Sequence, residues 1–335
     1  MRIYPENCVI LAPLSGFTDL PYRVSARSFG CRFAFTEMID AGSLARGTSK
    51  TLRFLERGKD EDWLGVQIIG AEDDSLAKAV DIINQHDFSV LDFNLGCPAP
   101  KVVKKGEGAA LGRKPDEAVK KIEILVRMSK IPVTAKIRIL DENDPAPTLY
   151  LAKRLRDAGA AALTVHGRVL KAFYSGPVYY DIIAELRREL DIQVIANGGV
   201  MNYENWLEIR EKTGCGSVML ARGAMGNPWI FSEINNHSAY SPPTVAELAG
   251  EMERHVGHII EYYGETLAMR ISRKIILDYL RGRGFSGKLK ALVSKLVRKS
   301  DFEAFMNEVK KGPSYKYWKC LESEKRLHTE RFLSR

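Results

Sequence analysis

The chain has 335 residues, of which 45% are hydrophobic and 27% charged, and both fractions are ordinary for a soluble globular protein. Its five cysteines are widely separated and include no CxxC pair, which excludes the usual zinc motifs and a disulfide framework, so no metal is expected. No apolar run approaches the roughly 18 residues that span a bilayer, and the N-terminal residues lack a signal-peptide pattern. We therefore expect a reduced, cytoplasmic protein without a membrane partner.

Short apolar runs alternate with amphipathic stretches over about the first 235 residues. The apolar runs predict eight strands, at 8–12, 33–37, 64–69, 90–95, 132–137, 161–166, 193–197 and 217–221. The stretches between them predict helices, among them one beginning near Leu20 with Asp19 as its cap, one at 73–85 and one at 115–129. Strands that alternate with helices form parallel βαβ units through right-handed crossovers.

Eight such units predict an α/β fold, a (β/α)8 TIM barrel over residues 1–240. A doubly wound sheet is the alternative, and it is disfavoured because no GxGxxG sequence follows the first strand. Ser241-Pro242-Pro243 then breaks the pattern, and only helical periodicity follows. The predicted helices lie at 244–263, 267–281, 288–299, 301–310 and 315–333. We therefore expect a second domain over residues 241–335, a small α-helical bundle.

The net charge of +8 is concentrated in this second part of the chain. Residues 241–335 hold 19 Lys and Arg against 12 Asp and Glu, whereas the preceding residues hold 31 against 30. Within 270–299, ten basic residues accompany a single acid, Asp278. A basic helical face is often only a solvated surface, but this density favours a polyanionic partner such as nucleic acid.

In a parallel barrel the functional groups lie at the carboxyl ends of the strands. Here those ends carry small or polar residues: Pro13-Leu14-Ser15, Glu37, Gln67, Asn94 with Cys97, Lys136 with Arg138, His166 with Arg168, Asn197-Gly198-Gly199, and Ala221-Arg222-Gly223. A lone Asn-Gly-Gly is usually only a tight turn. Paired with Arg222 in the next unit, it predicts a phosphate cradle, since glycine lets backbone N–H groups approach an anion.

Two of these residues indicate that the phosphate belongs to a flavin cofactor. Lys136 would stabilise negative charge on a reduced flavin ring, and Gln67 can both donate to and accept from its pyrimidine edge. His166 is included because Arg168 lies beside it, although a histidine at a strand end is often structural. Cys97 precedes a Gly- and Lys-rich loop at 101–113, which we expect to be a flexible clamp. The alternative for Cys97 is a buried structural cysteine.

Several motifs resemble those of the tRNA-dihydrouridine synthase family, most closely its bacterial B-type branch. They are APLSGFTDLPYR at 12–23, NLGCP at 94–98, KIR at 136–138, VHGR at 165–168, ANGGV at 196–200, LARGAMGNPWIF at 220–231 and MRISRK at 269–274. The resemblance spans both expected domains. It implies an FMN-containing barrel and a tRNA-binding helical domain, which together reduce tRNA uridines to 5,6-dihydrouridine with NADPH or NADH as reductant.

The resemblance also assigns roles to residues. It implies that the flavin passes a hydride to C6 of the uracil and that Cys97 protonates C5. It implies FMN contacts at Pro13, Leu14, Ser15, Gln67, Lys136, His166, Asn197, Gly198, Gly199, Ala221 and Arg222. It implies substrate contacts at Asn94, Arg168, Arg270, Arg273 and Lys274. An ordinary thiol, with a pKa of ~8.5, carries the proton that a general acid needs.

Three positions depart from the family pattern. Ala221 stands where glycine is common, Val169-Leu170 interrupts the usual HGRTR, and Ile275 stands where histidine is usual. A free-pyrimidine enzyme of the dihydroorotate dehydrogenase kind is the competing flavin barrel, but it would not need a basic helical domain. An RNA-binding module without catalysis is the other alternative, and the intact set of rim residues argues against it. We expect a monomer.

Overall fold

The computed structural model describes residues 2–239 and 241–313, so the helix predicted at 315–333 lies outside the described residues. The chain divides into two compact units. The barrel unit comprises residues 1–224 and 230–240, and the helical unit comprises residues 225–229 and 241–335. The short segment 225–229 packs with the helical unit although the sequence pattern placed it in the barrel. In the described part of the chain, no helix is both long enough and apolar enough to cross a membrane.

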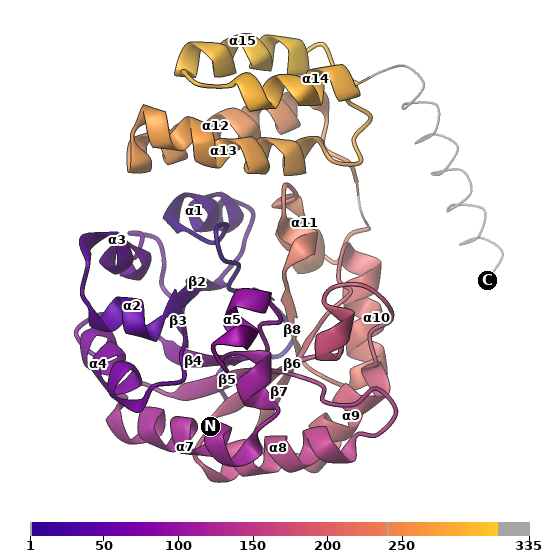
Figure 1. Cartoon of the computed structure of the whole chain (residues 1–335). Helices are drawn as coiled ribbons and strands as arrows, with labels where there is room; N and C mark the ends of the chain where they lie inside the picture. The colour runs from indigo at the N-terminus through magenta and orange to yellow at the C-terminus, as the bar shows by residue number, and fades with distance from the viewer. Residues whose placement is uncertain (1, 240, 314–335) are drawn as a thin grey trace, which may run out of the picture. The chain divides into compact units, whose positions relative to one another are not determined.

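The barrel unit contains eight parallel strands, which close in the order in which they follow one another along the chain (Figure 1). They are β1 Cys8–Leu11, β2 Phe33–Asp40, β3 Leu64–Ile69, β4 Val90–Leu95, β5 Val133–Arg138, β6 Ala162–His166, β7 Gln193–Asn197 and β8 Ser217–Leu220. β1 pairs with both β2 and β8, which closes the sheet. The predicted TIM barrel is therefore confirmed, and the doubly wound alternative is wrong, because an open sheet would not join its first strand to its last.

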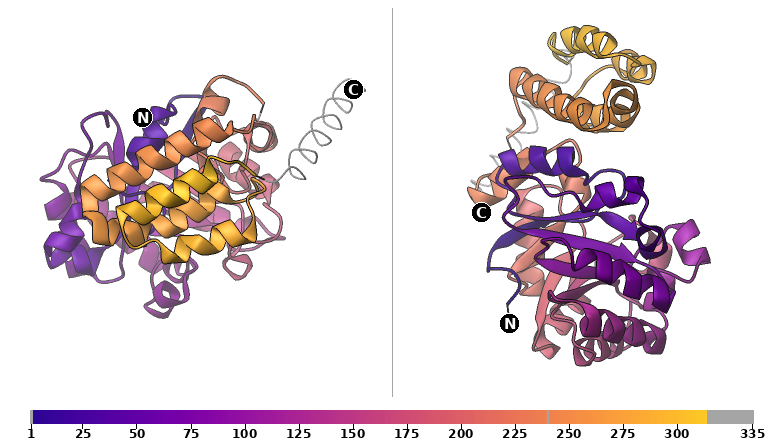
Figure 2. Two further views of the ribbon diagram at one scale, coloured as in Figure 1. Left: turned by 90° about the horizontal axis from the view of Figure 1, so that it is seen from above. Right: turned by 90° about the vertical axis from the view of Figure 1, so that its left-hand side faces the viewer.

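Helices follow the strands and lie outside them (Figure 2). In the barrel unit they are α1 Leu20–Ser28, α2 Ala41–Ala45, α3 Ser49–Leu52, η1 Arg53–Leu55, α4 Asp73–Ile83, α5 Pro100–Lys104, α6 Ala109–Gly112, α7 Pro115–Met128, α8 Ala146–Asp157, η2 Leu170–Ala172, α9 Tyr180–Glu189, α10 Tyr203–Thr213, η3 Arg222–Ala224 and α11 Trp229–Asn235. Asp19 caps α1 by accepting a hydrogen bond from the Tyr22 N–H (3.0 Å), as its position predicted. The apolar spacing of α4 buries Leu76, Val80 and Ile83 against the sheet side of the helix.

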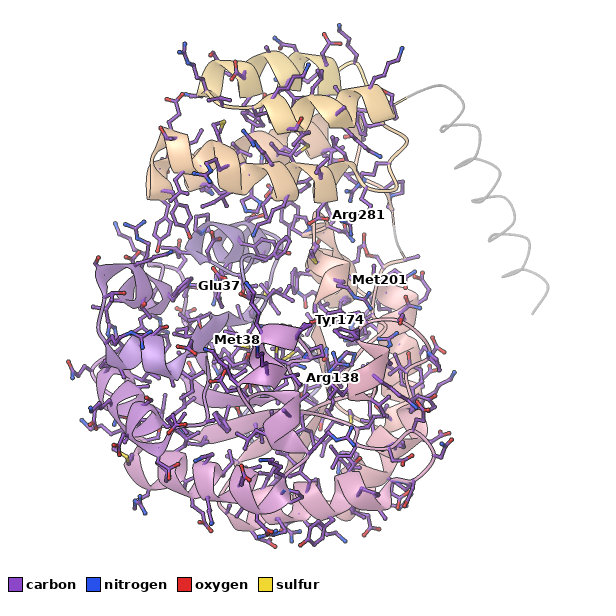
Figure 3. All side chains as sticks on the ribbon, in the orientation of Figure 1. Glu37, Met38, Arg138, Tyr174, Met201 and Arg281 are labelled. Carbon is purple, nitrogen blue, oxygen red and sulfur yellow. The ribbon has the colours of Figure 1, made fainter. Side chains whose placement is uncertain are left out.

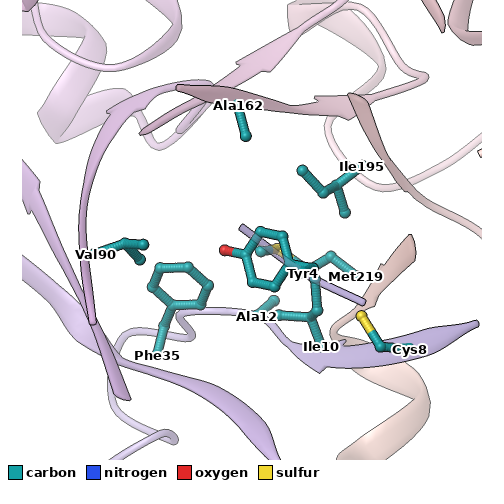
Figure 4. Close-up of a cluster of buried hydrophobic side chains, with 9 residues drawn as sticks. All are labelled: Tyr4, Cys8, Ile10, Ala12, Phe35, Val90, Ala162, Ile195 and Met219. Carbon is teal, nitrogen blue, oxygen red and sulfur yellow. The ribbon is translucent and has the colours of Figure 1, made fainter. Parts of the chain in front are cut away.

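Apolar side chains fill the interior of the barrel. Figure 4 shows one such cluster, formed by Tyr4, Cys8, Ile10, Ala12, Phe35, Val90, Ala162, Ile195 and Met219. Val90 and Ala162 are the first residues of β4 and β6, and Cys8 is the first residue of β1. Because side chains close the amino ends of the strands in this way, the polar groups of the barrel are left to gather at the carboxyl ends.

The helical unit consists of α12 Val245–Tyr263, α13 Glu265–Leu280, α14 Gly287–Leu292, η4 Val293–Lys295 and α15 Lys299–Val309. The single helix predicted at 288–299 is wrong, because the chain leaves helical geometry at Leu296. There the Leu296 carbonyl accepts two hydrogen bonds from Arg273, at 3.2 and 2.8 Å. The Asp301 carboxylate then accepts from the N–H groups of Val297 and Arg298, which starts α15.

Candidate active site

Predicted rim residues of five neighbouring strands lie together at the carboxyl end of the barrel. Gln67, Asn94, Lys136, His166 and Asn197 belong to β3, β4, β5, β6 and β7 respectively. The strand register sets Asn94 beside Lys136, and His166 beside Asn197. Paired residues on neighbouring strands point to the same face of the sheet, so the side chains within each of these two pairs lie side by side.

The segment after β1 lies at this same end. The Ala12 N–H donates to the carbonyl of Leu220, the last residue of β8, at 2.9 Å. Beyond it the chain turns back on itself, because the Leu14 N–H donates to the Thr18 hydroxyl oxygen at 2.9 Å. The Gly16 N–H donates to the Glu37 carboxylate of β2. Pro13, Leu14 and Ser15 therefore form a fixed turn beside the end of β8.

A chain of buried side-chain hydrogen bonds leads to Cys97. Gln67 Nε2 donates to Asp92 Oδ2 (2.6 Å), and Asn94 Nδ2 donates to Gln67 Oε1 (2.8 Å). The Cys97 N–H donates to Asn94 Oδ1 (2.8 Å). Burial raises the pKa of Asp92 to about 6, although hydrogen bonds from Thr134 and Gln67 act in the opposite direction. The sequence analysis did not single out Asp92, because one acid within an apolar strand carries no motif of its own.

The backbone of Cys97 is held on its other side by the segment that follows. The Ala109 N–H donates to the Cys97 carbonyl at 3.0 Å. Gly108 has a φ of +57°, and a Cβ there would lie only 2.8 Å from the same carbonyl oxygen. The Cys97 side chain is half-buried. Cys97 is therefore less buried than the structural cysteine that was the alternative interpretation, and less buried than Cys8, Cys31 and Cys215.

The expectation of a flexible loop at 101–113 is wrong in its local structure. Two short helices, α5 and α6, occupy it, and Pro100 stands in the first turn of α5, where its missing N–H costs nothing. Within α6, Ala109, Leu111 and Gly112 are buried. Apolar contacts and the bond to Cys97 therefore order the second half of this segment, whereas Lys101, Lys104 and Lys105 in the first half are exposed.

Four cationic side chains act electrostatically on His166. Burial and then the charges of Lys136, Arg138, Arg168 and Arg222 lower the pKa of the His166 imidazole well below its ordinary value, so the ring is neutral at pH 7. Arg168 also lies 3.4 Å from His166 Nε2 through its Nη1. Burial, followed by the charge of Arg138, lowers the pKa of Lys136 to about 8. Lys136 Nζ donates to Asn197 Oδ1 at 2.9 Å.

The loops after β7 and β8 contain glycines that pack closely against neighbouring protein atoms. Gly198 and Gly199 have φ values of +124° and +80°. A Cβ at Gly198 would lie 3.0 Å from His166 Cδ2, and one at Gly223 would meet the Val200 carbonyl oxygen. Ala221 is not among the described non-glycine residues with positive φ, so alanine is accommodated there without strain. The positive charge around these loops suits a phosphate group, since Arg168 and Arg222 both act on the neighbouring His166.

Arg138 and Tyr174 are two further residues of the site, and they lie next to each other in Figure 3. Arg138 Nε donates to the Gly96 carbonyl and its Nη1 to the Phe173 carbonyl, both at 2.7 Å. The Tyr174 ring, 51% exposed, has the guanidinium carbons of Arg138 and Arg222 each 5.4 Å from its centre. Sequence reasoning placed Arg138 at a strand end without a role and missed Tyr174, because the loop after β6 has no distinctive pattern.

The substrate residues predicted in the helical unit all lie on α13, in different surroundings. Arg270 is exposed, and Lys274 is half-buried. Arg273 donates two hydrogen bonds to the Leu296 carbonyl, which ties α13 to the segment between η4 and α15. Ile275, which stands where the family pattern has histidine, is buried in the helical core.

No group of three or more His, Cys, Asp or Glu residues suited to a metal ion occurs within residues 2–239 and 241–313.

Comparisons with known proteins show which family the chain resembles. The family model for dihydrouridine synthases (Dus) matches residues 10–312. A tRNA-dihydrouridine synthase B from Xanthomonas campestris pv. campestris is 34% identical over 291 residues, which cover 86% of this chain and 88% of that protein. A probable tRNA-dihydrouridine synthase from Rhizobium leguminosarum bv. phaseoli is 36% identical over 277 residues, covering 82% and 86%.

Among solved structures, a morphinone reductase variant in complex with tetrahydroNAD superimposes with a TM-score of 0.50. The match covers 71% of this chain and 89% of that one at 11% identity, so the likeness concerns the fold alone. The family match extends over nearly the whole chain and includes the glycine-containing loops after β7 and β8, the segment that carries Cys97, and α13. On this evidence the chain belongs to the dihydrouridine synthase family.

Proposed function

We propose that Cys97 is the proton donor of this dihydrouridine synthase, a flavin-dependent oxidoreductase that converts uridine in tRNA to 5,6-dihydrouridine. The observation that supports this role is the fixed backbone of Cys97. The Cys97 N–H donates a hydrogen bond to the Asn94 side chain, and the Cys97 carbonyl accepts one from the Ala109 N–H. The half-buried thiol is therefore held at one place beside the strand ends. A general acid acts efficiently only when it is held within hydrogen-bond reach of its target atom.

The flavin that we propose for this site is FMN, which when bound and reduced by NADPH or NADH would supply the hydride for C6 of the uracil. Cys97 Sγ–H gives its proton to C5, is left as a thiolate and regains a proton from water. Asn94, beside Cys97, orients the uracil, and Arg168 contributes to binding the substrate.

The residues that would hold FMN fall into two groups. Asn197, Gly198, Gly199, Ala221 and Arg222 would bind its phosphate, for which the positive φ of the two glycines and the nearby cations are suited. The rest of the cofactor would be contacted by Pro13, Leu14, Ser15, Gln67, Lys136 and His166. The Lys136 ammonium would stabilise negative charge on the ring, and the neutral His166 would donate or accept a hydrogen bond without adding charge.

We further propose that residues 1–240 form the catalytic domain and that residues 241–335 bind tRNA, with Arg270 and Lys274 among the contacts. The basic composition of the second part supports this assignment. We propose a monomer that acts in the cytoplasm. The dihydroorotate dehydrogenase alternative and the non-catalytic alternative are both disfavoured by the family match, which includes α13 and the cysteine segment.

Replacing Cys97 tests the proposed role directly. Cys97→Ala should slow dihydrouridine formation by about 10²- to 10⁴-fold, the usual contribution of a general acid. Reduction of the bound flavin by the nicotinamide cofactor should stay normal, because no proton from Cys97 enters that step. Stopped-flow absorbance measures the flavin step, and mass spectrometry of tRNA digests measures the product.

Cys31→Ala is the matched control, since it removes a buried thiol whose sulfur lies near the Phe33 carbonyl, at the start of β2. Mapping dihydrouridine in tRNA from cells without the gene, and from cells that carry each variant, also identifies the modified position. Wild type and Cys31→Ala should restore the modification and Cys97→Ala should not. Full turnover by Cys97→Ala would remove Cys97 from the reaction.

A further inference from the structure

The buried side chains beneath Cys97 form a hydrogen-bond chain with a defined direction. We propose that Asp92 is a positioning residue, which fixes this direction and thereby holds the Cys97 backbone in place. The inference rests on the proposed role of Cys97 and adds a residue to which no motif assigned a function. Asp92 is almost completely buried in β4, and Gln67, through which it acts, is fully buried in β3.

The direction of the chain follows from its two ends. At one end the N–H groups of Gly96 and Cys97 can only donate, so Asn94 must turn its oxygen toward them, at 3.1 and 2.8 Å. Asn94 then offers its NH₂ group to Gln67 Oε1 at 2.8 Å. At the other end the Asp92 carboxylate accepts from Gln67 Nε2 at 2.6 Å. Both ends therefore require the same orientation of the two amides.

A second donor keeps Asp92 in its place. The Thr134 hydroxyl donates to Asp92 Oδ1 at 2.6 Å, while Gln67 donates to the other oxygen. Each carboxylate oxygen thus accepts from one neighbouring strand, β5 on one side and β3 on the other. A carboxylate is suited to this position because it accepts through both oxygens, whereas an amide has one acceptor and one donor side.

Asp92→Asn should therefore loosen Cys97 for part of the time, because the new amide can turn its NH₂ group toward either neighbour. If its NH₂ group faces Thr134, the hydroxyl oxygen accepts from it and the direction at Cys97 is kept, but the hydroxyl proton loses its acceptor. If it faces Gln67, the Gln67 amide must turn over. Asn94 must then turn as well, which sets its NH₂ group against the N–H groups of Gly96 and Cys97. The first arrangement leaves the Thr134 hydroxyl proton without the acceptor that Asp92 provided, and the second removes the acceptor that holds Cys97.

The chain offers a rescue that a merely structural aspartate would not allow. In the double variant Asp92→Asn with Gln67→Glu, the carboxylate moves one position along the same chain. The Thr134 hydroxyl can then donate to the amide oxygen at position 92, and the amide NH₂ group can donate to the carboxylate at position 67. Asn94 Nδ2 also donates to that carboxylate, so its oxygen faces Cys97 as before. The original direction at Cys97 is thereby restored.

The Cys97 amide itself reports the effect. Labelling the full-length protein with ¹⁵N-cysteine gives one backbone signal for each of five cysteines, and Cys97→Ser assigns the signal of interest. Asp92→Asn should accelerate hydrogen exchange at the Cys97 amide by about tenfold or more, because its acceptor is lost for part of the time. Exchange at Cys31 and Cys215, whose amides donate to the Ala26 carbonyl and the Thr213 hydroxyl, should change by less than about threefold.

The double variant should bring Cys97 exchange back to within about threefold of the wild-type rate. Three results would overturn the proposal: an unchanged Cys97 amide in Asp92→Asn, equal acceleration at all the cysteine amides, or no recovery in the double variant. If Asp92→Asn does not fold, Thr134→Val removes one donor from Asp92 and should accelerate hydrogen exchange at the Cys97 amide but not at the other cysteine amides. A Cys97 amide that is unaffected there would equally contradict the proposal.

This experiment does not depend on turnover. If Cys97→Ala remained fully active, the proton-donor role would fail while the exchange result still decided the role of Asp92. If the exchange result fails while Cys97→Ala is inactive, the Cys97 position is maintained by other contacts, such as the Ala109 bond.

Discussion

Lys136 is a buried ammonium group whose charge depends on pH within an accessible range. Burial and the nearby Arg138 lower its pKa to about 8, and it donates a hydrogen bond to a neutral amide, that of Asn197. A cofactor that carries a phosphate and develops negative charge on its ring binds better when Lys136 is protonated. By linkage, binding such a cofactor raises the pKa of Lys136 and weakens as pH rises above the pKa of the free protein.

We therefore predict that FMN affinity falls as pH rises through about 8, by up to about tenfold per pH unit. Lys136→Met should bind FMN more weakly at pH 7 and should lose this pH dependence between 8 and 10. Fluorescence titration of the flavin-free protein measures both quantities. Lys120→Met, on the exposed side of α7, is the control and should titrate like wild type. A pH profile in Lys136→Met that matches wild type would assign the dependence to another group.

At the scale of elements, the turn between α5 and α6 determines where the Cys97 carbonyl lies. Gly106 and Gly108 both have positive φ, at +75° and +57°. A Cβ at Gly106 would meet nothing within 4 Å, whereas one at Gly108 would lie 2.8 Å from the Cys97 oxygen and 3.0 Å from its Cβ. The two glycines thus share the backbone requirement, and only Gly108 adds a contact with the proposed proton donor.

Alanine at the two positions separates these effects. Gly106→Ala should cost about 1–2 kcal/mol of unfolding free energy through backbone strain and leave turnover unchanged. Gly108→Ala should cost more, because it adds a steric overlap, and should lower the rate of dihydrouridine formation by shifting Cys97. Chemical denaturation and single-turnover kinetics measure the two quantities. Equal activity in both variants would show that Cys97 tolerates displacement of this turn.

Local pattern predicted most strands and their order, but not the places where a distant side chain decides the backbone. The bounds of β3, β4 and β7 match the predicted runs because each run is apolar and flanked by turn residues. The helix predicted at 288–299 ends early because Arg273, about 20 residues away in the chain, binds the Leu296 carbonyl. Asp92 could not be predicted in the same way, because its proposed positioning role depends on hydrogen bonds from the neighbouring strands β3 and β5, and the residue pattern of one strand does not reveal those.

Across the whole molecule, the positive charge of the helical unit divides into paired and unpaired groups. Lys310 and Lys311 form ion pairs with Glu253 and Glu308, both at 2.6 Å. Lys288 in α14 and Lys295 in η4 are exposed and form no ion pair with a described residue. Arg273 is already engaged with Leu296, so its replacement would disturb the fold of the unit as well as its charge. An RNA phosphate would therefore bind the unpaired lysines at a lower cost than the paired ones.

This division provides a test of the tRNA-binding role in which total charge is held equal. Lys288→Glu with Lys295→Glu changes the net charge by as much as Lys310→Glu with Lys311→Glu. We predict that the first pair weakens tRNA binding by about tenfold or more and lowers the slope of log affinity against log salt by about one for each lost phosphate contact. The second pair should change affinity by less than about threefold, because those lysines are already neutralised by glutamates. Filter binding over a series of salt concentrations measures both. Equal losses in the two variants would mean that the tRNA responds to overall charge, and an unchanged slope in the first would place the phosphate contacts on another surface.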